Sequence, residues 1–447
     1  MKTTPSFLRS SIDAARSSLN TAQRILLGYV GISLVGLALL WGIGGRSGKV
    51  PVLDHFFTSV SAVSTTGLTT VSIADTYGFA GQVVVLLLIQ IGGLGYMTLA
   101  ALLISRFDRR IRESQEEQAQ TDFALPPEAG VQSFARAACV LTAGVEIIGA
   151  IVLYFAFRAE GIEQPLWNAI FHSVSAFCTS GLSLFADSFE SFADRPMVLL
   201  PIAIISILGA VGFLVAWDIG RSLRERQLRI AYTNKVVLVV FSAILLGATV
   251  LLYLTDERLA ALPGTDRWLN AFFAAMTSST TVGFNSVPTT ALSGAAFVLV
   301  VATMVVGASP SGTSGGIKTT TTSVLFVTVI SSLRQNRQAT LLGRPVSAQK
   351  MRASSTTLVF YLVMMIAATF CLAVMEGDQD LRSIFFEVVS ALGTIGLSYG
   401  ASEQFGPWGK GLIIVLMIAG RVGILAFGAA LLSEGDDEEE LKNAERV

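Results

Sequence analysis

The residues best placed to do chemistry are hydroxyl and glycine residues that recur four times at one spacing. The order is Phe, three residues, Ser or Thr, three residues, Thr, one residue, Gly, and then Leu or Phe. The four copies read FTSVSAVSTTGL from Phe57, FHSVSAFCTSGL from Phe171, FAAMTSSTTVGF from Phe273 and FEVVSALGTIGL from Phe386. Because glycine permits backbone angles closed to other residues, successive carbonyl groups can turn toward one axis. This chemistry is coordination of a cation by backbone oxygens.

Each copy also predicts a short helix that ends at its Thr-x-Gly motif. Phe57, Ser61 and Thr65 stand at i, i+4 and i+8, which places them on one stripe of a helix. A helix of about ten residues is too short to cross a membrane. Its C-terminus carries about half a negative charge, so four such ends that converge would attract a cation.

The residue types favour a large monovalent cation. No Asp or Glu falls within a Thr-x-Gly segment, and the nearest acid, Glu387, stands at the start of the fourth short helix. Rings of carbonyl oxygens replace the hydration shell of potassium, whereas rings of carboxylates suit divalent or unselective passage. The alternative, that the small residues only allow close helix packing, does not explain the fourfold register. The predicted filter residues are Thr65, Thr66, Gly67, Thr179, Ser180, Gly181, Thr281, Val282, Gly283, Thr394, Ile395 and Gly396.

The elements that must position these segments are membrane spans. Of 447 residues, 52% are hydrophobic and 14% are charged, against about 25% charged in soluble domains. A span needs about 20 apolar residues. Eight such runs lie near 25–45, 79–104, 137–157, 196–217, 236–254, 295–330, 356–375 and 411–432. Lys and Arg gather in the N-terminal segment and in the second, fourth and sixth connections, so both termini are expected in the cytoplasm.

The sixth run is interrupted by SPSGTSGGIKTTTTS, which is rich in residues that break helices. Irregular backbone inside a membrane must be buried in protein or line a cavity, so a gate below the filter is predicted; immobile packing is the alternative. Arg421, near the middle of the last span, needs partners, and carbonyls of this loop are the best candidates. The predicted gate residues are Gly312, Thr313, Ser314, Gly315, Gly316, Lys318 and Arg421.

Other kinds of site find little support. His55 and His172 make no metal motif and are each expected at the wet end of a helix. An intramembrane enzyme is a remote alternative, because the spans offer Glu146 as a lone acid without a catalytic partner. No nucleotide motif is present, and GGLG at 92–95 and GAVG at 209–212 are expected to allow close packing.

Four units of span, short helix, Thr-x-Gly loop and span in one chain resemble the Trk/Ktr/HKT superfamily of potassium transporters. The resemblance covers about residues 25–432 and is closest to the KtrB-type membrane subunit, since the first span leads directly into the first pore loop. It implies an all-α polytopic membrane protein with eight transmembrane and four pore helices around one pseudo-fourfold pore. Gly67 agrees with potassium selectivity, because relatives with Ser in the first loop tend to pass sodium.

The resemblance also implies function and partners. It implies potassium uptake across the cytoplasmic membrane by a homodimer. It also implies a partner, a cytosolic ring of KtrA-type subunits, which binds the regulatory nucleotide that this chain does not bind. Sodium is expected as an effector, and a sodium or unselective cation channel or symporter is the alternative. In relatives the segment corresponding to the interrupted stretch is an intramembrane loop that obstructs the pore beneath the filter, and GGIK resembles its terminal part, which ends at Lys318. An arginine at the Arg421 position helps to hold the gate region and forms a positive barrier in the pore. Ile424 departs from the family pattern, where Pro is frequent.

The expected organisation follows from these segments. In order, it is an N-terminal cytoplasmic segment 1–24, first repeat 25–106, cytoplasmic linker 107–133, second repeat 134–220, basic loop 221–235, third repeat 236–332 with intramembrane loop 309–320, basic loop 333–355, fourth repeat 356–432 and acidic tail 433–447.

Overall fold

The computed structural model describes residues 21–44, 50–95, 131–225, 230–336 and 338–432. These residues form helices joined by short connections, and one antiparallel hairpin of β1 (Thr340–Leu341) and β2 (Arg344–Pro345). Most of the expected N-terminal segment 1–24, most of the linker 107–133 and the acidic tail lie outside the described residues, while residues 21–24 belong to α2 (Thr21–Gly44).

The principal helices fall into four units of the same order, which are a long helix, a short helix and a second apolar helix. The first unit contains α2 (Thr21–Gly44), α3 (Val52–Ser64) and α5 (Phe79–Leu94). The second contains α8 (Val131–Ala159), α9 (Pro165–Phe177), α10 (Pro196–Val211) and α11 (Phe213–Glu225). The third contains α12 (Tyr232–Thr255), α14 (Gly264–Thr280), α15 (Gly294–Val305) and α16 (Thr319–Leu333). The fourth contains α17 (Ala348–Met375), α18 (Leu381–Gly393), α20 (Pro407–Val422) and α21 (Ile424–Leu432).

Short elements occupy the connections between the short helices and the second apolar helices. They are α4 (Ile73–Thr76), η2 (Glu190–Phe192), η3 (Thr289–Ala291) and α19 (Ala401–Gln404). One further turn, α13 (Glu257–Ala260), precedes α14.

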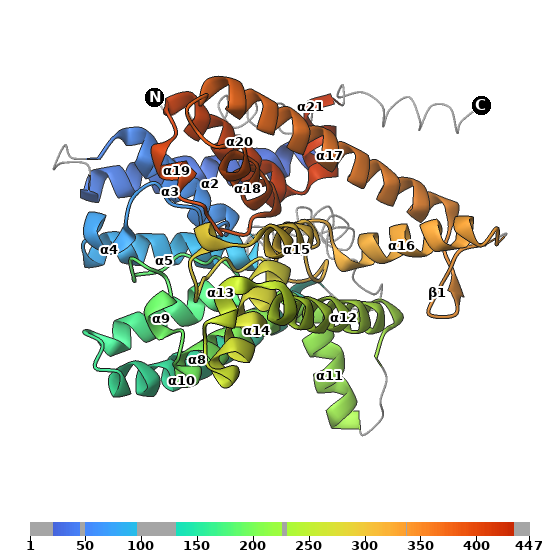
Figure 1. The fold of residues 1–447 in the computed structure, drawn as a ribbon, viewed down its shortest axis with the longest axis horizontal. Coiled ribbons are helices and arrows are strands. Elements are labelled where there is room, and N and C mark those ends of the chain that lie inside the picture. Colours follow the sequence, from blue (N-terminus) through green and yellow to red (C-terminus); the bar gives the residue numbers. More distant parts are fainter. Residues whose placement is uncertain (1–20, 45–49, 96–130, 226–229, 337, 433–447) are drawn as a thin grey trace, which may run out of the picture.

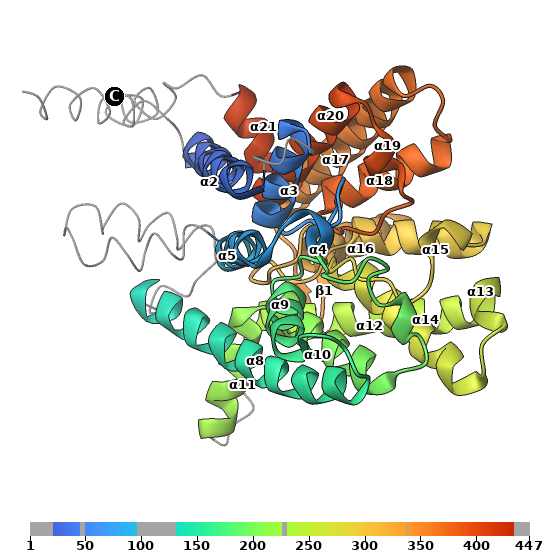
Figure 2. The same ribbon diagram turned by 90° about the vertical axis from the view of Figure 1, so that its left-hand side faces the viewer.

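The four units close into a ring. Helix α5 of the first unit packs on α9 of the second, α10 of the second on α14 of the third, and α15 of the third on α18 of the fourth. Helix α20 of the fourth unit then packs on α3 of the first. Figures 1 and 2 show this order as the colours pass from blue through green and yellow to red around one centre. The short helices α3, α9, α14 and α18 therefore lie inside the ring, where their ends can meet.

The outer helices expose the apolar surface that a membrane requires. Within the described residues, α2, α8, α12 and α17 are each long and apolar enough to cross a membrane, and two bent pairs raise the number of candidate spans to six. Helices α5, α15 and α16 are shorter apolar helices. Large apolar side chains such as Leu34, Ile148, Leu246 and Ile366 are exposed on the long helices. Helices lie in the described part of each of the eight predicted apolar runs, while the count of eight crossings stays a prediction.

Two of the predicted spans are broken where the sequence analysis expected continuous helices. Helices α10 and α11 meet at an angle of 94° at Gly212, and α20 and α21 meet at 108° at Gly423. Both glycines have positive φ, of 93° and 95°, which other residues adopt at a cost. A methyl group on Gly212 would lie 2.6 Å from the Gly312 nitrogen. The first break therefore makes room for the loop of the third unit.

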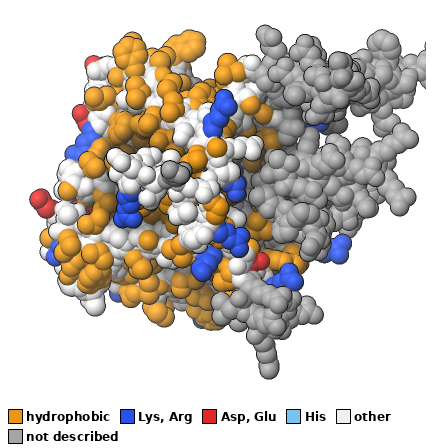
Figure 3. All heavy atoms as spheres, turned by 90° about the vertical axis from the view of Figure 1, so that its right-hand side faces the viewer, with side chains coloured by type: hydrophobic (Ala, Val, Ile, Leu, Met, Phe, Trp, Pro, Cys, Tyr) orange, Lys and Arg blue, Asp and Glu red, His pale blue; other side chains and the backbone are white. Residues whose placement is uncertain are grey.

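The end of the molecule that carries α16 and the hairpin is shown in Figure 3. Lys and Arg side chains are distributed across the described part of this end, and hydrophobic side chains gather along its margins. The cytoplasmic placement of this end stays a prediction from the positive-inside rule.

Candidate cation filter and gate

The four Thr-x-Gly segments meet in a closed ring at the centre of the molecule. A methyl group on Gly67 would lie 2.3 Å from the Ser180 carbonyl oxygen, and one on Gly181 would lie 2.0 Å from that of Val282. The ring continues from Gly283 to the Ile395 oxygen at 2.0 Å, and from Gly396 to the Thr66 oxygen at 2.3 Å. Each glycine thus lies against the carbonyl of the residue between Thr and Gly in the next unit. No larger residue fits at these four positions without moving a neighbouring backbone.

Local backbone geometry explains why the short helices end here. Thr65, Thr281 and Thr394 end α3, α14 and α18 in the left-handed conformation, with φ of 51°, 59° and 48°. Thr179 adopts the same conformation two residues after Phe177, the last residue of α9, with φ of 49°. A β-branched residue with positive φ is strained, and its recurrence in all four units indicates that the ring imposes it. The sequence identified these residues but gave no sign of their conformation.

Hydroxyl groups of the short helices hold three of the segments from behind. Ser61 Oγ accepts a hydrogen bond of 3.0 Å from the Gly67 N–H, and Ser390 Oγ accepts one of 3.0 Å from the Gly396 N–H. In the second unit, Ser175 Oγ donates to the Leu182 carbonyl at 2.7 Å. The serine of the repeating motif therefore fixes the backbone beside the glycine.

Two buried polar residues add to this support, and sequence reasoning missed both. Glu387 Oε1 accepts hydrogen bonds from the Ser398 hydroxyl at 2.5 Å and the Tyr399 N–H at 2.9 Å, while Oε2 accepts one from Ser402 at 2.6 Å. His172 is paired with the Ser183 hydroxyl at 2.9 Å and accepts a bond from the Leu184 N–H at 3.3 Å. Both residues directly follow the phenylalanine of the repeating motif. This shared position is the sequence feature from which their supporting role could have been predicted.

The expectation that the histidines lie at wet helix ends was wrong. His172 is fully buried among aromatic rings and stacks on Phe185 with ring centres 4.6 Å apart. His55 is also fully buried, and its Nδ1 lies 2.9 Å from the Tyr77 hydroxyl. The neutral ring suits both sites, because an isolated charge is costly in an apolar interior. Within the described ranges, no group of three or more potential metal ligands comes together.

The interrupted sixth segment lies directly against the base of the ring. Thr313 Oγ1 lies 3.0 Å from the Thr179 hydroxyl and donates to the Phe177 carbonyl at 3.1 Å. The Gly315 N–H donates to the Thr281 hydroxyl at 3.0 Å, and a methyl group on Gly315 would lie 2.0 Å from Thr394 Oγ1. The loop thus touches threonines of three of the four filter segments.

The loop is fixed at both of its ends. Val306 and Ile317 form a parallel bridge, in which the Gly307 N–H donates to the Ile317 carbonyl at 2.9 Å. The Ser309 N–H donates to the Ala210 carbonyl at 3.2 Å, beside the break at Gly212. Lys318 bonds back to the Ser314 carbonyl. The backbone groups freed by the missing helical turns therefore find partners in neighbouring irregular backbone.

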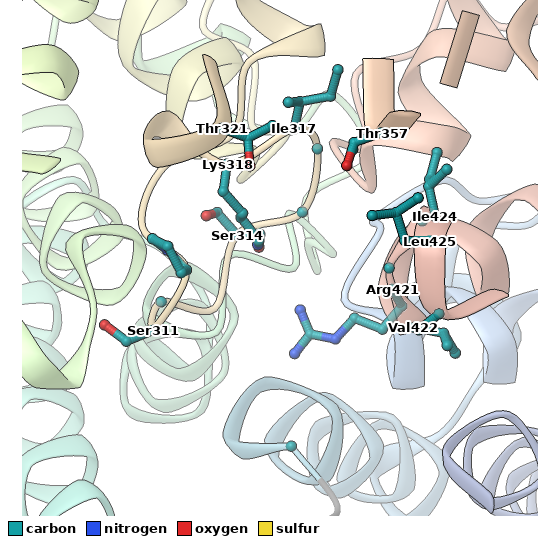
Figure 4. A pocket seen from close by; sticks show the side chains of 18 of the residues that line it. Ser311, Ser314, Ile317, Lys318, Thr321, Thr357, Arg421, Val422, Ile424 and Leu425 are labelled. Carbon is teal, nitrogen blue, oxygen red and sulfur yellow. The ribbon is translucent and has the colours of Figure 1, made fainter. Parts of the chain in front are cut away.

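Arg421 connects the loop to two other units. Its guanidinium donates to the Thr313 carbonyl at 2.5 Å and also to the Gly92 carbonyl at the end of α5. These are the carbonyl partners that an intramembrane charge requires. Figure 4 shows the side chain of Arg421 extending toward the loop, with Lys318 and Ser314 on the facing side.

A cavity of about 380 Å³ lies between the loop and Arg421. Its lining includes Lys318, Thr321 and Thr357, and residues 93–95 at the end of α5. Both charged side chains of its described lining, Lys318 and Arg421, are basic. Arg421 therefore presents positive charge to this cavity.

The comparisons with known proteins agree on one family. A family model described as TrkH, cation transport protein, matches residues 35–432. The Ktr system potassium uptake protein B of Vibrio alginolyticus is 32% identical over 416 residues, which is 91% of this chain and 90% of that protein. The potassium/sodium uptake protein NtpJ of Enterococcus hirae is 31% identical and covers 95% of each chain.

A solved structure supports the fold. The crystal structure of the potassium transporter TrkH from Vibrio parahaemolyticus matches with a TM-score of 0.73 at 20% identity. The match covers 93% of this chain and 86% of the other. At this identity the likeness concerns the arrangement of the helices.

Proposed function

Since the chain belongs to the TrkH family of cation transport proteins, we propose that it takes up potassium across the cytoplasmic membrane through the ring of Thr-x-Gly segments. Family membership confirms the predicted resemblance to Trk and Ktr transporters and the prediction that the chain is not an enzyme. The names of the relatives support potassium as the transported ion.

The observation that carries the proposal is the closed ring of glycines and carbonyls. Four backbone oxygens, from Thr66, Ser180, Val282 and Ile395, each lie beside the glycine of the adjacent unit. Backbone oxygens can replace the water shell of potassium, and a ring without carboxylates does not favour divalent ions. The hydroxyl oxygens of Thr65, Ser180 and Thr394 are buried without a partner among the described residues, which suits a path that ions occupy.

The loop between Gly312 and Lys318 is the gate in this proposal. Its contacts with Thr179 and Thr281 support a closed position at the base of the filter. Arg421 holds the loop there and, with Lys318, places positive charge in the path of a cation. Opening then requires the loop to leave both the threonines and Arg421.

Regulation is assigned to a second protein. Two of the relatives are named as proteins B of Ktr systems, and these names support a partner subunit for this chain. We assign that partner the nucleotide-binding role and place it at the basic end of the molecule as a cytosolic ring that contacts a homodimer. Sodium enters as an effector or a second transported ion, because the relative NtpJ is named for potassium and sodium uptake.

Ion flux into liposomes tests the proposal. The purified chain is reconstituted, and uptake of rubidium, potassium and sodium is measured for the native sequence and for Gly67→Ser. Added atoms on Gly67 meet the Ser180 oxygen, so the variant should widen the ring and admit more sodium relative to potassium. Equal sodium and potassium flux in the native protein would reject potassium selectivity.

A further inference from the structure

The third filter segment lacks both internal supports that the second and fourth segments have. Where the second and fourth units carry His172 and Glu387, the third carries Ala274, whose side chain ends at a methyl group. Where the other units carry a serine, the third carries Thr277, whose buried hydroxyl has no partner among the described residues. The third short helix therefore holds its own filter segment less firmly than its counterparts do.

Packing behind this segment is also incomplete. A cavity of about 20 Å³ lies there, and its lining includes Thr277, Asn285 and Ser286. The Ser286 hydroxyl is likewise buried without a partner in the described part of the chain. A filter needs its oxygens at fixed positions, so something outside the third unit must hold this segment.

The outer connection of the second unit supplies that support. The Phe189 N–H donates to the Asn285 carbonyl at 2.9 Å, and the Asn285 N–H donates to the Ser188 hydroxyl at 3.2 Å. Glu190 Oε1 accepts a hydrogen bond of 2.5 Å from the Asn285 side-chain amide. Asn285 follows the filter glycine, Gly283, by two residues. We name residues 188–190 the clamp.

The clamp is itself anchored. Phe189 is fully buried, and its ring lies 4.9 Å from that of Phe284, which follows the filter glycine directly. Asp187 accepts a hydrogen bond of 3.1 Å from the Ser191 N–H, which fixes the turn that carries Glu190. Ser188 adopts a positive φ of 57°, a conformation that needs support from its surroundings. These contacts join the second and third units at the filter.

Other units use contacts across the ring less heavily. Thr289 of the third unit bonds to the Ser398 carbonyl of the fourth, but the fourth segment also has Glu387 and Ser390 behind it. The dependence on a neighbouring unit is therefore greatest at the third segment.

We propose that the clamp of the second unit positions the third filter segment and so sets the selectivity of the ring for potassium over sodium. This inference rests on the proposed function and adds a positioning role for Glu190 and Asn285. Glu190 bonds to the side chain of Asn285, which follows the filter glycine by two residues. Loss of the clamp frees Asn285, which lines the small cavity, and loosens the backbone that leads back to the Val282 carbonyl. A looser oxygen ring discriminates less between potassium and the smaller sodium ion.

Matched variants at one position test the clamp. In reconstituted liposomes, the ratio of potassium to sodium flux is measured for the native chain, Glu190→Ala and Glu190→Gln. Glutamine keeps an acceptor oxygen for Asn285 but removes the charge, so its ratio should stay near the native value. Alanine removes the acceptor, and its ratio should fall roughly three- to tenfold, the change expected for loss of one strong hydrogen bond. Asn285→Ala should lower the ratio by a similar factor, and the double alanine variant should lower it no further.

The outcomes separate the clamp from its alternatives. A ratio that falls equally for Glu190→Gln and Glu190→Ala would assign the effect to surface charge and overturn the proposal. So would well-assembled alanine variants with the native ratio. If Glu190→Ala does not assemble, Ser188→Ala, which removes only the 3.2 Å bond, must lower the ratio for the proposal to stand. A native chain without potassium preference would reject the proposed function itself, whereas a selective native chain with selective variants would reject the clamp alone.

Discussion

Arg421 donates a hydrogen bond of 2.5 Å to the carbonyl of Thr313, the residue whose hydroxyl lies 3.0 Å from Thr179 in the second filter segment. One side chain thus connects the last apolar segment, through the loop, to the base of the Thr-x-Gly ring. The same guanidinium contacts the Gly92 carbonyl of the first unit. Three units and the loop therefore share a single charged group, and any movement of the loop must break its contact with Arg421.

Replacing Arg421 by methionine should raise potassium flux. The change removes a positive charge beneath the filter and releases the Thr313 carbonyl, and a buried polar group left unpaired costs about 1–3 kcal/mol. Rubidium uptake into liposomes measures the effect, with Arg421→Lys as the control that keeps the charge. Lysine should give an intermediate flux. Native flux in the methionine variant would show that Arg421 neither holds the loop nor opposes the ion.

A methyl group on Gly315 should displace the loop from the filter. It would meet the Thr394 hydroxyl at 2.0 Å and the Gly393 carbonyl at 2.4 Å. Gly315→Ala should therefore raise rubidium uptake several-fold in the absence of any partner protein. Gly411→Ala, in α20, is the matched control, since no atom lies within 4 Å of its added methyl group. Equal rubidium uptake by Gly315→Ala and Gly411→Ala would contradict the role of the loop as a gate.

Glu387 should act as a positioning residue for the fourth filter segment. Glu387→Ala leaves the donors of Ser398, Tyr399 and Ser402 without their acceptor, at a cost of about 1–3 kcal/mol for each buried group. Thermal unfolding should move to lower temperature, and the ratio of potassium to sodium flux should fall. Glu387→Gln retains one acceptor oxygen, so its unfolding temperature and its flux ratio should lie between those of the native chain and Glu387→Ala. A stable alanine variant with native selectivity would contradict this role.

The stability of the protein should carry a pH dependence from Glu190. Burial raises the pKa of its carboxyl, Asp187 adds to the rise, and Asn285 and Arg258 oppose it. Because the folded-state pKa lies above the unfolded value, the folded protein binds more protons between the two. The contribution of this group to stability therefore falls as pH rises through that window. The unfolding temperature is measured as a function of pH, from about pH 4 to pH 7, for the native chain and for Glu190→Gln. The two curves should differ in slope, and parallel curves would exclude the effect.

Much of the fold follows from patterns within short stretches of the sequence. Runs of apolar residues mark all eight helical segments, and the spacing of Phe57, Ser61 and Thr65 predicts α3 and its end at the first Thr-x-Gly motif. Hydrophobic burial and helix periodicity act over a few turns, so one unit of sequence contains the required signal. The prediction of an interrupted segment near Ser309 also follows from local helix breakers, because Pro310 and Gly312 are incompatible with a regular helix.

Features that depend on contacts between distant segments were not predictable. The bends at Gly212 and Gly423 occur in segments whose composition suits a straight helix, and the first bend arises because the loop of another unit passes beside it. His172 looked like a residue for a wet helix end, but aromatic rings from three segments enclose it. The contact between Glu190 and Asn285 joins residues 95 positions apart. Spacing in the sequence carries no information about such pairs.

The most direct test of the central claim is to locate the ion in the ring. Crystals of the native protein grown with rubidium in place of potassium give anomalous scattering that identifies the bound ion by element. The account predicts rubidium density among the carbonyl oxygens of Thr66, Ser180, Val282 and Ile395, and its loss when sodium replaces rubidium. Rubidium found elsewhere, with none in the ring, would contradict the assignment of the Thr-x-Gly segments as the filter.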